Sequence, residues 1–118
     1  MRCYAFDVDE TLEGFGGPVS LQSLMDLRNE GHIVGLCGNW GAFCSSVSGW
    51  QHLISVIVNL GTPKDWAMSH FRQHVGGCDD YVLVGNRLGV TGASDDEGAA
   101  QRARWRFILE RDFAAGER

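Results

Sequence analysis

RCYAFDVDETL, residues 2–12, is the most informative stretch of the 118-residue sequence. Its first half is apolar and aromatic, and its second half brings three acids, Asp7, Asp9 and Glu10. Such a run is typical of a buried strand that feeds a polar loop. Carboxylates two residues apart at a strand end face one crevice and repel each other unless a cation lies between them. The stretch therefore predicts a metal site at Asp7 and Asp9; the alternative is that Asp9 or Thr11 only caps a helical turn.

Further apolar segments alternate with helical ones along the rest of the chain. Strands are predicted at residues 2–8, 32–37, 53–60 and 81–84, with a weaker fifth strand at 88–91. Two helices are predicted from the N-cap Ser20 to Gly31 and over residues 42–52. A third runs from the N-cap Thr62, with Pro63 as its first helical residue, to Gly76, and a long C-terminal helix starts at the capping box Ser94-x-x-Glu97. This order predicts an α/β, three-layer, Rossmann-like fold with a parallel sheet of four or five strands. Ligands of such sheets bind at the carboxyl ends of the strands.

Composition narrows the class of protein. The chain is 44% hydrophobic and 21% charged, which predicts one globular domain over residues 1–118. No apolar run approaches the roughly 20 residues of a membrane span, and no leader-like segment precedes the first strand, so we expect a cytoplasmic protein. A formal charge of -5 disfavours duplex nucleic acid as a partner. The four cysteines form no CxxC pair, and we expect them to be reduced.

The string from Tyr4 to Leu12 resembles the first motif of the haloacid dehalogenase superfamily of phosphohydrolases, an apolar strand that runs into DxDxT. The resemblance implies that Asp7 attacks phosphorus to form an aspartyl phosphate. It implies that Asp9 acts first as general acid and then as base for water, while Thr11 steadies the loop through a hydrogen bond. It also implies Mg²⁺ as cofactor, bound by the Asp7 carboxylate and the backbone carbonyl of Asp9.

The stretch Gly35-Leu36-Cys37-Gly38-Asn39 is similar to the second motif of that family, with Cys37 at a position where threonine is common. A thiol is a weaker donor than a hydroxyl, so a bound phosphoryl group would rely more on the backbone N–H groups of Gly38 and Asn39. The alternative for Cys37 is an ordinary buried strand residue.

Lys64 fits the third motif, in which a lysine balances the nucleophile and the phosphoryl group. It is the chain's only lysine beside nine arginines, and it lies in the first turn of a predicted helix, where the helix dipole disfavours a cation. The alternative is a solvent-facing side chain.

The fourth motif is incomplete. The family has an acid after Gly85, whereas this chain has Asn86, whose amide oxygen can still bind a metal but without charge. Asp95 or Asp96 would complete the Mg²⁺ site if the loop folds back. Their alternative role is to stabilise the start of the last helix.

The gaps between the motifs hold no room for an inserted lid, so the chain is similar to a capless member of the superfamily. The resemblance implies a Mg²⁺-dependent phosphatase acting on a phosphorylated substrate. Sugar phosphates, nucleotides, nucleic-acid ends and phosphoproteins all remain candidates, and the acidic chain favours a small molecule. A homo-oligomer is one way to exclude water from an open site.

Two other functions compete with the phosphatase. The first is a binding or assembly module that keeps the fold but has lost turnover, which Cys37 and Asn86 suggest. The second is a receiver domain, disfavoured because the third predicted strand leads into Asn59-Leu60-Gly61 rather than into an aspartate.

Overall fold

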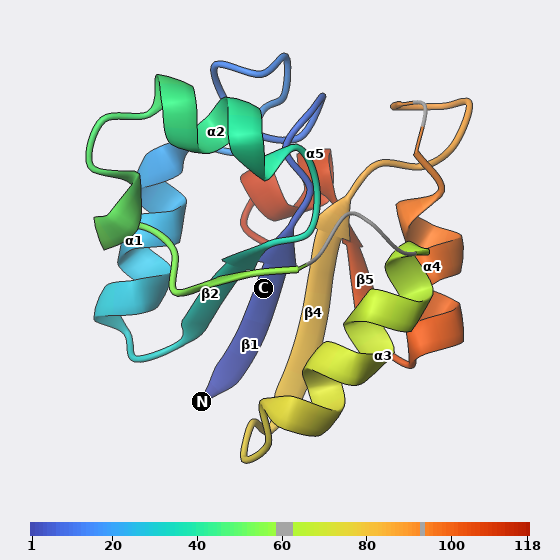
Figure 1. Ribbon diagram of the computed structural model, residues 1–118. Coiled ribbons are helices and arrows are strands. Elements are labelled where there is room, and N and C mark those ends of the chain that lie inside the picture. The colour runs from blue at the N-terminus through green and yellow to red at the C-terminus, as the bar shows by residue number, and fades with distance from the viewer. Residues whose placement is uncertain (59–62, 93) are drawn as a thin grey trace.

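The computed structural model describes residues 1–58, 63–92 and 94–118. Its elements in chain order are β1 (Arg2–Phe6), α1 (Leu21–Asn29), β2 (Ile33–Leu36), α2 (Trp40–Ser46), the 3₁₀ helix η1 (Trp50–His52), β3 (Val56–Ile57), α3 (Lys64–His74), β4 (Asp80–Gly85), α4 (Asp96–Ala103), β5 (Arg106–Leu109) and α5 (Glu110–Ala114). The five strands form one sheet in the order β3-β2-β1-β4-β5, and every neighbouring pair is parallel (Figure 1). The predicted α/β class and the parallel sheet are confirmed.

Helices cover both faces of the sheet because successive strand residues point to opposite sides. Tyr4 and Phe6 of β1 pack with buried side chains of α1, α2 and α5, whereas Cys3 and Ala5 pack with those of α3 and α4. Figure 1 shows the same division, with α3 and α4 together on one side of the sheet and α1 and α2 on the other. This arrangement of two cores around a parallel sheet is compatible with a Rossmann-like three-layer fold.

Helix α1 begins and ends as the sequence predicts. The Ser20 side chain accepts a hydrogen bond of 3.2 Å from the N–H of Ser23, which is the N-cap interaction. Gly31 follows the last turn with φ +89°, a left-handed conformation that only glycine adopts without strain.

Among the described residues no helix is long and apolar enough to cross a membrane.

The predicted helix over residues 42–52 is wrong at both ends. Helix α2 begins at Trp40 and stops at Ser46, and a separate 3₁₀ turn follows at Trp50–His52. Val47 is extended and Gly49 has φ +76°, so the chain leaves the helix in a serine- and glycine-rich stretch of low helix propensity. Val47 and Trp50 still pack against the core, which explains why their spacing resembled a helix face.

The third predicted strand is shorter than residues 53–60. Strand β3 holds only Val56 and Ile57, and because it pairs with β2 alone it is an edge strand with an exposed Ile57. Three predictions fall outside the described residues: the end of this strand at residues 59–60, the segment 59–61 that disfavours a receiver domain, and the N-cap Thr62. The prediction that Pro63 is the first helical residue is wrong. Pro63 has an extended ψ of 136° and immediately precedes α3, which begins at Lys64.

The long C-terminal helix predicted from Ser94 is wrong. Asp95, not Ser94, caps α4, and the helix ends at Arg104, whose φ of +61° turns the chain into β5. The fifth strand is therefore Arg106–Leu109. Residues 88–91, the predicted fifth strand, contribute only an isolated bridge between Leu88 and Gly92.

Candidate active site

Four polar residues follow directly after strands and meet at one edge of the sheet. Asp7 comes after β1, Cys37 after β2, Asn86 after β4 and Glu110 after β5. The backbone ladder continues into this edge, because the N–H of Asp7 donates to the carbonyl of Val84 at 2.9 Å. The edge is the carboxyl end of the strands, where the sequence predicts the site.

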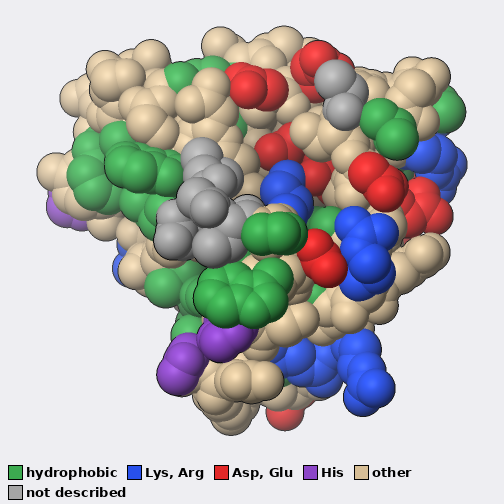
Figure 2. Space-filling model, turned by 45° about the vertical axis from the view of Figure 1, so that its right-hand side comes forward, with side chains coloured by type: hydrophobic (Ala, Val, Ile, Leu, Met, Phe, Trp, Pro, Cys, Tyr) green, Lys and Arg blue, Asp and Glu red, His purple; other side chains and the backbone are tan. Residues whose placement is uncertain are grey.

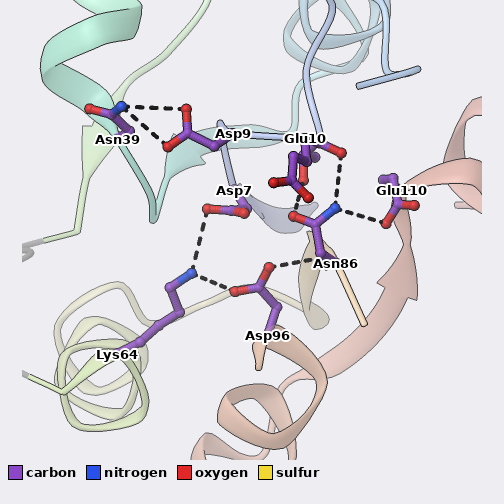
Figure 3. Close-up of polar contacts among 9 residues, drawn as sticks. Asp7, Asp9, Glu10, Asn39, Lys64, Asn86, Asp96 and Glu110 are labelled. Carbon is purple, nitrogen blue, oxygen red and sulfur yellow. Dashed lines mark hydrogen bonds and ion pairs between the residues drawn. The ribbon is translucent and has the colours of Figure 1, made fainter. Parts of the chain in front are cut away.

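Asp7, Lys64 and Asp96 form a charged cluster at this edge (Figure 3). Lys64 Nζ lies 3.5 Å from Asp7 Oδ1 and 2.5 Å from Asp96 Oδ1. Asp96 is fully buried, Asp7 is 5% exposed, and the Lys64 side chain is 23% exposed. The lone lysine thus joins α3 to the ends of β1 and α4, and it is not the solvent-facing residue of the alternative interpretation.

Two carboxylates share one ammonium group in this cluster, and the pKa of Asp7 is shifted as a result. Burial raises the pKa of Asp7 to about 7, with a further contribution from the charge of Asp96, although Lys64 opposes the shift. Burial by itself lowers the pKa of Lys64, but the adjacent acids outweigh it and hold the pKa above its ordinary value. Lys64 therefore stays charged, and Asp7 is the group whose ionisation is costly.

Asp96 joins the cluster and Asp95 does not. The Asp96 Oδ2 atom accepts a hydrogen bond of 2.8 Å from the N–H of Asn86. A Cβ at Gly85 would lie 2.4 Å from the same oxygen, so β4 must end in glycine for α4 to approach. Asp95 instead caps α4 through the N–H of Gly98, at 3.1 Å. Of the two acids predicted as metal ligands, the structure brings only Asp96 to Lys64.

Gly38 allows the loop after β2 to lie against the Asp7 carboxylate. A Cβ built at this position would lie 2.1 Å from Asp7 Oδ1, which no side chain could tolerate without displacing the carboxylate. Within the described part of the chain, the N–H groups of Gly38 and Asn39 have no acceptor. Both are the donors that the sequence predicts for a phosphoryl group.

Asp9 points away from the charged cluster, at the exposed side of the loop. Its two carboxylate oxygens lie 3.4 and 3.3 Å from Asn39 Nδ2 (Figure 3). The amide oxygen of Asn39 accepts from the N–H of Ala42 at 3.4 Å and so caps α2. Asn39 therefore fixes the position of Asp9 relative to the start of α2.

Asn86 is held in one orientation by three neighbours. Its Nδ2 donates to the carbonyl of Glu10 at 2.9 Å and to Glu110 Oε2 at 3.2 Å, while its Oδ1 accepts from Thr11 Oγ1 at 3.1 Å (Figure 3). The amide nitrogen and the amide oxygen of Asn86 are thus both hydrogen-bonded to other protein groups. A buried carboxylate, Glu110, lies directly behind the position where the family pattern has an acid.

Glu110 is not among the residues that the sequence predicts for the site, because it falls in the predicted C-terminal helix. Its segment RFILE nevertheless repeats the pattern of CYAFD, a short apolar run that ends in an acid. That pattern is the signal that could have identified it.

The sequence also predicts Thr11 and Cys37 as residues of the substrate site. Both are 0% exposed, so neither side chain faces a ligand. Thr11 has the expected role of steadying the loop, through its bond to Asn86. Cys37 belongs to the core shared with α3 and α4, and burial raises the pKa of its thiol well above the ordinary range. The buried-residue interpretation of Cys37 is the one that the structure supports.

Mg²⁺ is the cofactor that the sequence resemblance implies. Among the described residues no three His, Cys, Asp or Glu side chains form a ready ligand group. Asp7 and Asp96 do present two buried carboxylates to a single ammonium, which leaves one negative charge in excess when both are ionised. Mg²⁺ typically binds through one or two carboxylates and keeps several waters, so this donor set fits it.

Comparison of the chain with protein-family models, with curated proteins and with solved structures gives no match. The site must therefore be interpreted from its own geometry.

Proposed function

We propose that the chain is a Mg²⁺-dependent phosphohydrolase of the haloacid dehalogenase type that uses Asp7 as its nucleophile. The observation that supports this most strongly is the position of Lys64, 3.5 Å from the Asp7 carboxylate at the carboxyl edge of the sheet. A buried aspartate beside a fixed cation and the open N–H groups of Gly38 and Asn39 suit attack on a phosphoryl group.

In the first step an Asp7 carboxylate oxygen forms a bond to phosphorus, and the bond from phosphorus to the ester oxygen breaks. Asp9 donates its proton to the departing oxygen, so an alcohol leaves and an aspartyl phosphate remains. Asp9 suits this role because it lies two residues after Asp7, is exposed and is held by Asn39.

In the second step water attacks the phosphorus of the aspartyl phosphate. Asp9, now ionised, takes a proton from that water, the bond from phosphorus to Asp7 breaks, and inorganic phosphate leaves. Asp7 and Asp9 thereby return to their starting states, and the reaction consumes one water for each ester.

Lys64, held by Asp96, balances the negative charge that the reaction brings to the site. Lys64 offsets negative charge on Asp7 and on the transferred group, while Asp96 holds the ammonium in place at 2.5 Å. Mg²⁺, held by Asp7 and Asp96, would supply further neutralisation of the phosphoryl oxygens.

The test is a phosphatase assay with a panel of phosphorylated small molecules, with and without Mg²⁺. Wild-type protein and Asp7→Asn are compared, because the variant keeps the size of the side chain and removes the nucleophile. We expect Mg²⁺-dependent release of phosphate by the wild type and at least a 1000-fold lower rate for the variant, in line with the loss of a covalent nucleophile. Equal rates in the two proteins would contradict the proposal.

A second candidate is a binding module without turnover, and Asn86 is the observation that favours it. The amide removes a negative charge from the position where an acid would complete the metal site. This module would bind Mg²⁺ and phosphate but release no product from any substrate of the panel.

We propose that the protein acts in the cytoplasm. The proposal is supported by the four cysteines, which are free in the structure, as is usual in a reducing compartment.

A further inference from the structure

A cavity of about 430 Å³ lies between α3 and the end of α4, and none of the residues that line it belongs to the charged cluster. Its lining contains three guanidinium groups, an amide and a hydroxyl, and no carboxylate: Ser69, Arg72, Gln73, Arg102, Ala103 and Arg104. Three of the nine arginines of a chain with a net charge of -5 thus line one hollow. We call this hollow the arginine cavity.

The fold holds the side chains of two of these arginines, Arg72 and Arg102, and the backbone of the third, Arg104. The Arg72 guanidinium lies over the ring of Tyr81, 4.9 Å from its centre, and its Nη1 donates to the carbonyl of Arg104. Among the described residues, the arginines that form salt bridges are Arg87, Arg102 and Arg106, so Arg102 is the one arginine of the cavity that is paired with carboxylates. Arg72 and Arg104 therefore keep their charge available for an anion from outside.

The arginine cavity is a neighbour of the proposed active site. Arg102 lines both this cavity and a second hollow of about 340 Å³, whose charged lining also includes Lys64 and the acids Asp65, Asp95 and Asp96. Its Nε atom lies 3.3 Å from Asp65 Oδ2, on the residue after Lys64. Figure 2 shows basic side chains both at the centre of this face and below it.

The helix geometry gives the separation of the two sites. Eight residues separate Lys64 from Arg72 on α3, which is about 12 Å along the helix axis. Guanidinium groups bind phosphate through paired hydrogen bonds, and fixed guanidinium groups lose little entropy on binding.

We propose that the arginine cavity binds a second phosphoryl group of the substrate, about 12 Å from the phosphoryl group that is transferred. This inference rests on the proposed function, and it narrows the substrate class to small molecules phosphorylated at both ends. Arg72 and Arg104 are the binding residues, and Arg102 lies between the two phosphoryl groups.

The test uses synthetic alkanols phosphorylated at one end and alkanediols phosphorylated at both ends, in a series of chain lengths. Binding is measured by calorimetry on the Asp7→Asn protein, which should not turn the compounds over, and kcat/KM is measured on the wild type. We expect the doubly phosphorylated compound of matching length to bind about 10-fold more tightly than its singly phosphorylated partner. Salt should reduce the difference because the arginines are exposed.

Arg72→Gln and Arg104→Gln are each expected to remove the 10-fold preference and to leave binding of the singly phosphorylated compound unchanged. Arg111→Gln is the matched control, because Arg111 is an exposed residue of α5 on the other face of the sheet. Two arginine variants are used so that a folding defect in one does not decide the result.

The outcomes separate this inference from the proposed function. Equal affinity for the singly and doubly phosphorylated compounds at every chain length, or a preference that survives both arginine variants, would overturn the inference even if the enzyme is active. A preference that depends on Arg72 and Arg104, without turnover by the wild type, would support the arginine cavity and overturn the phosphohydrolase.

Discussion

Asp7→Asn should make the metal-free protein less sensitive to rising pH. Burial, with the nearby Asp96, raises the pKa of Asp7 from its ordinary 3.8 to about 7. The folded state therefore binds the Asp7 proton more tightly than the unfolded state does. The stability that this proton contributes is fully present below about pH 4 and is lost as pH rises through 7.

The size of the effect follows from the shift. One pKa unit corresponds to about 1.4 kcal/mol, so the full shift of about three units makes the ionised Asp7 cost on the order of 4 kcal/mol. Between pH 5 and pH 8, where about two of these units are traversed, the wild type should lose about 3 kcal/mol more unfolding free energy than Asp7→Asn. Titrating groups outside the charged cluster are common to both proteins and cancel in the comparison.

The assay is urea unfolding followed by tryptophan fluorescence, at pH 5 and pH 8, with EDTA present. Urea is used because a salt denaturant would screen the charges of the cluster. Addition of Mg²⁺ at pH 8 should then stabilise the wild type and leave Asp7→Asn nearly unchanged. The reasoning is refuted if both proteins lose the same unfolding free energy between the two pH values, or if Mg²⁺ stabilises them equally.

Two further substitutions test the geometry around the nucleophile. Gly38→Ala puts a methyl group where the Asp7 carboxylate lies and should lower kcat roughly 100-fold in a steady-state assay. The control Gly41→Ala has open space around its Cβ and should keep the wild-type rate. Full activity of Gly38→Ala would contradict the close approach of Gly38 to Asp7. Glu110→Gln replaces the carboxylate behind Asn86 and should raise the Mg²⁺ concentration for half-maximal activity about 10-fold. The shift is measured by metal titration at constant substrate concentration. An unchanged titration would show that Glu110 has no influence on the metal.

The first two strands of the sheet were predictable because each apolar run ends in residues that break a strand. Residues 2–8 pass from aromatic side chains to acids, and residues 32–37 stop at Gly38-Asn39. The N-cap Ser20 is equally local, since the hydroxyl and the N–H that it binds lie three residues apart. Signals of this kind need no knowledge of distant parts of the chain.

The C-terminal third was mispredicted because the spacing of Trp105, Ile108 and Leu109 satisfies a helix as well as a strand. In the structure Trp105 packs in the core with α3 and α4 while Ile108 packs in the core on the other face of the sheet, which an extended chain allows and one face of a helix does not. The left-handed turn at Arg104 that separates α4 from β5 is carried by a residue type with no preference for it. Only the pairing of β5 with β4 resolves the ambiguity.

Two of the three members of the charged cluster were predictable from the sequence without an alternative. Asp7 and Lys64 were identified because the first lies in a recognisable string and the second is the only lysine. The choice between Asp95 and Asp96 depends on how the loop after β4 returns to the site, and that is fixed by the close contact at Gly85. The buried state of Cys37 likewise follows from packing against α3 and α4 rather than from its neighbours in sequence.

Covalent capture of the phosphoryl group tests the proposed chemistry most directly. A doubly phosphorylated substrate is mixed with the wild type and Mg²⁺, turnover is quenched in acid, and the peptides are analysed by mass spectrometry. We expect one phosphoryl group on the peptide that carries Asp7, removed by hydroxylamine as an acyl phosphate must be. Steady turnover with an unmodified Asp7 peptide, or with the phosphoryl group on another residue, would contradict nucleophilic attack by Asp7.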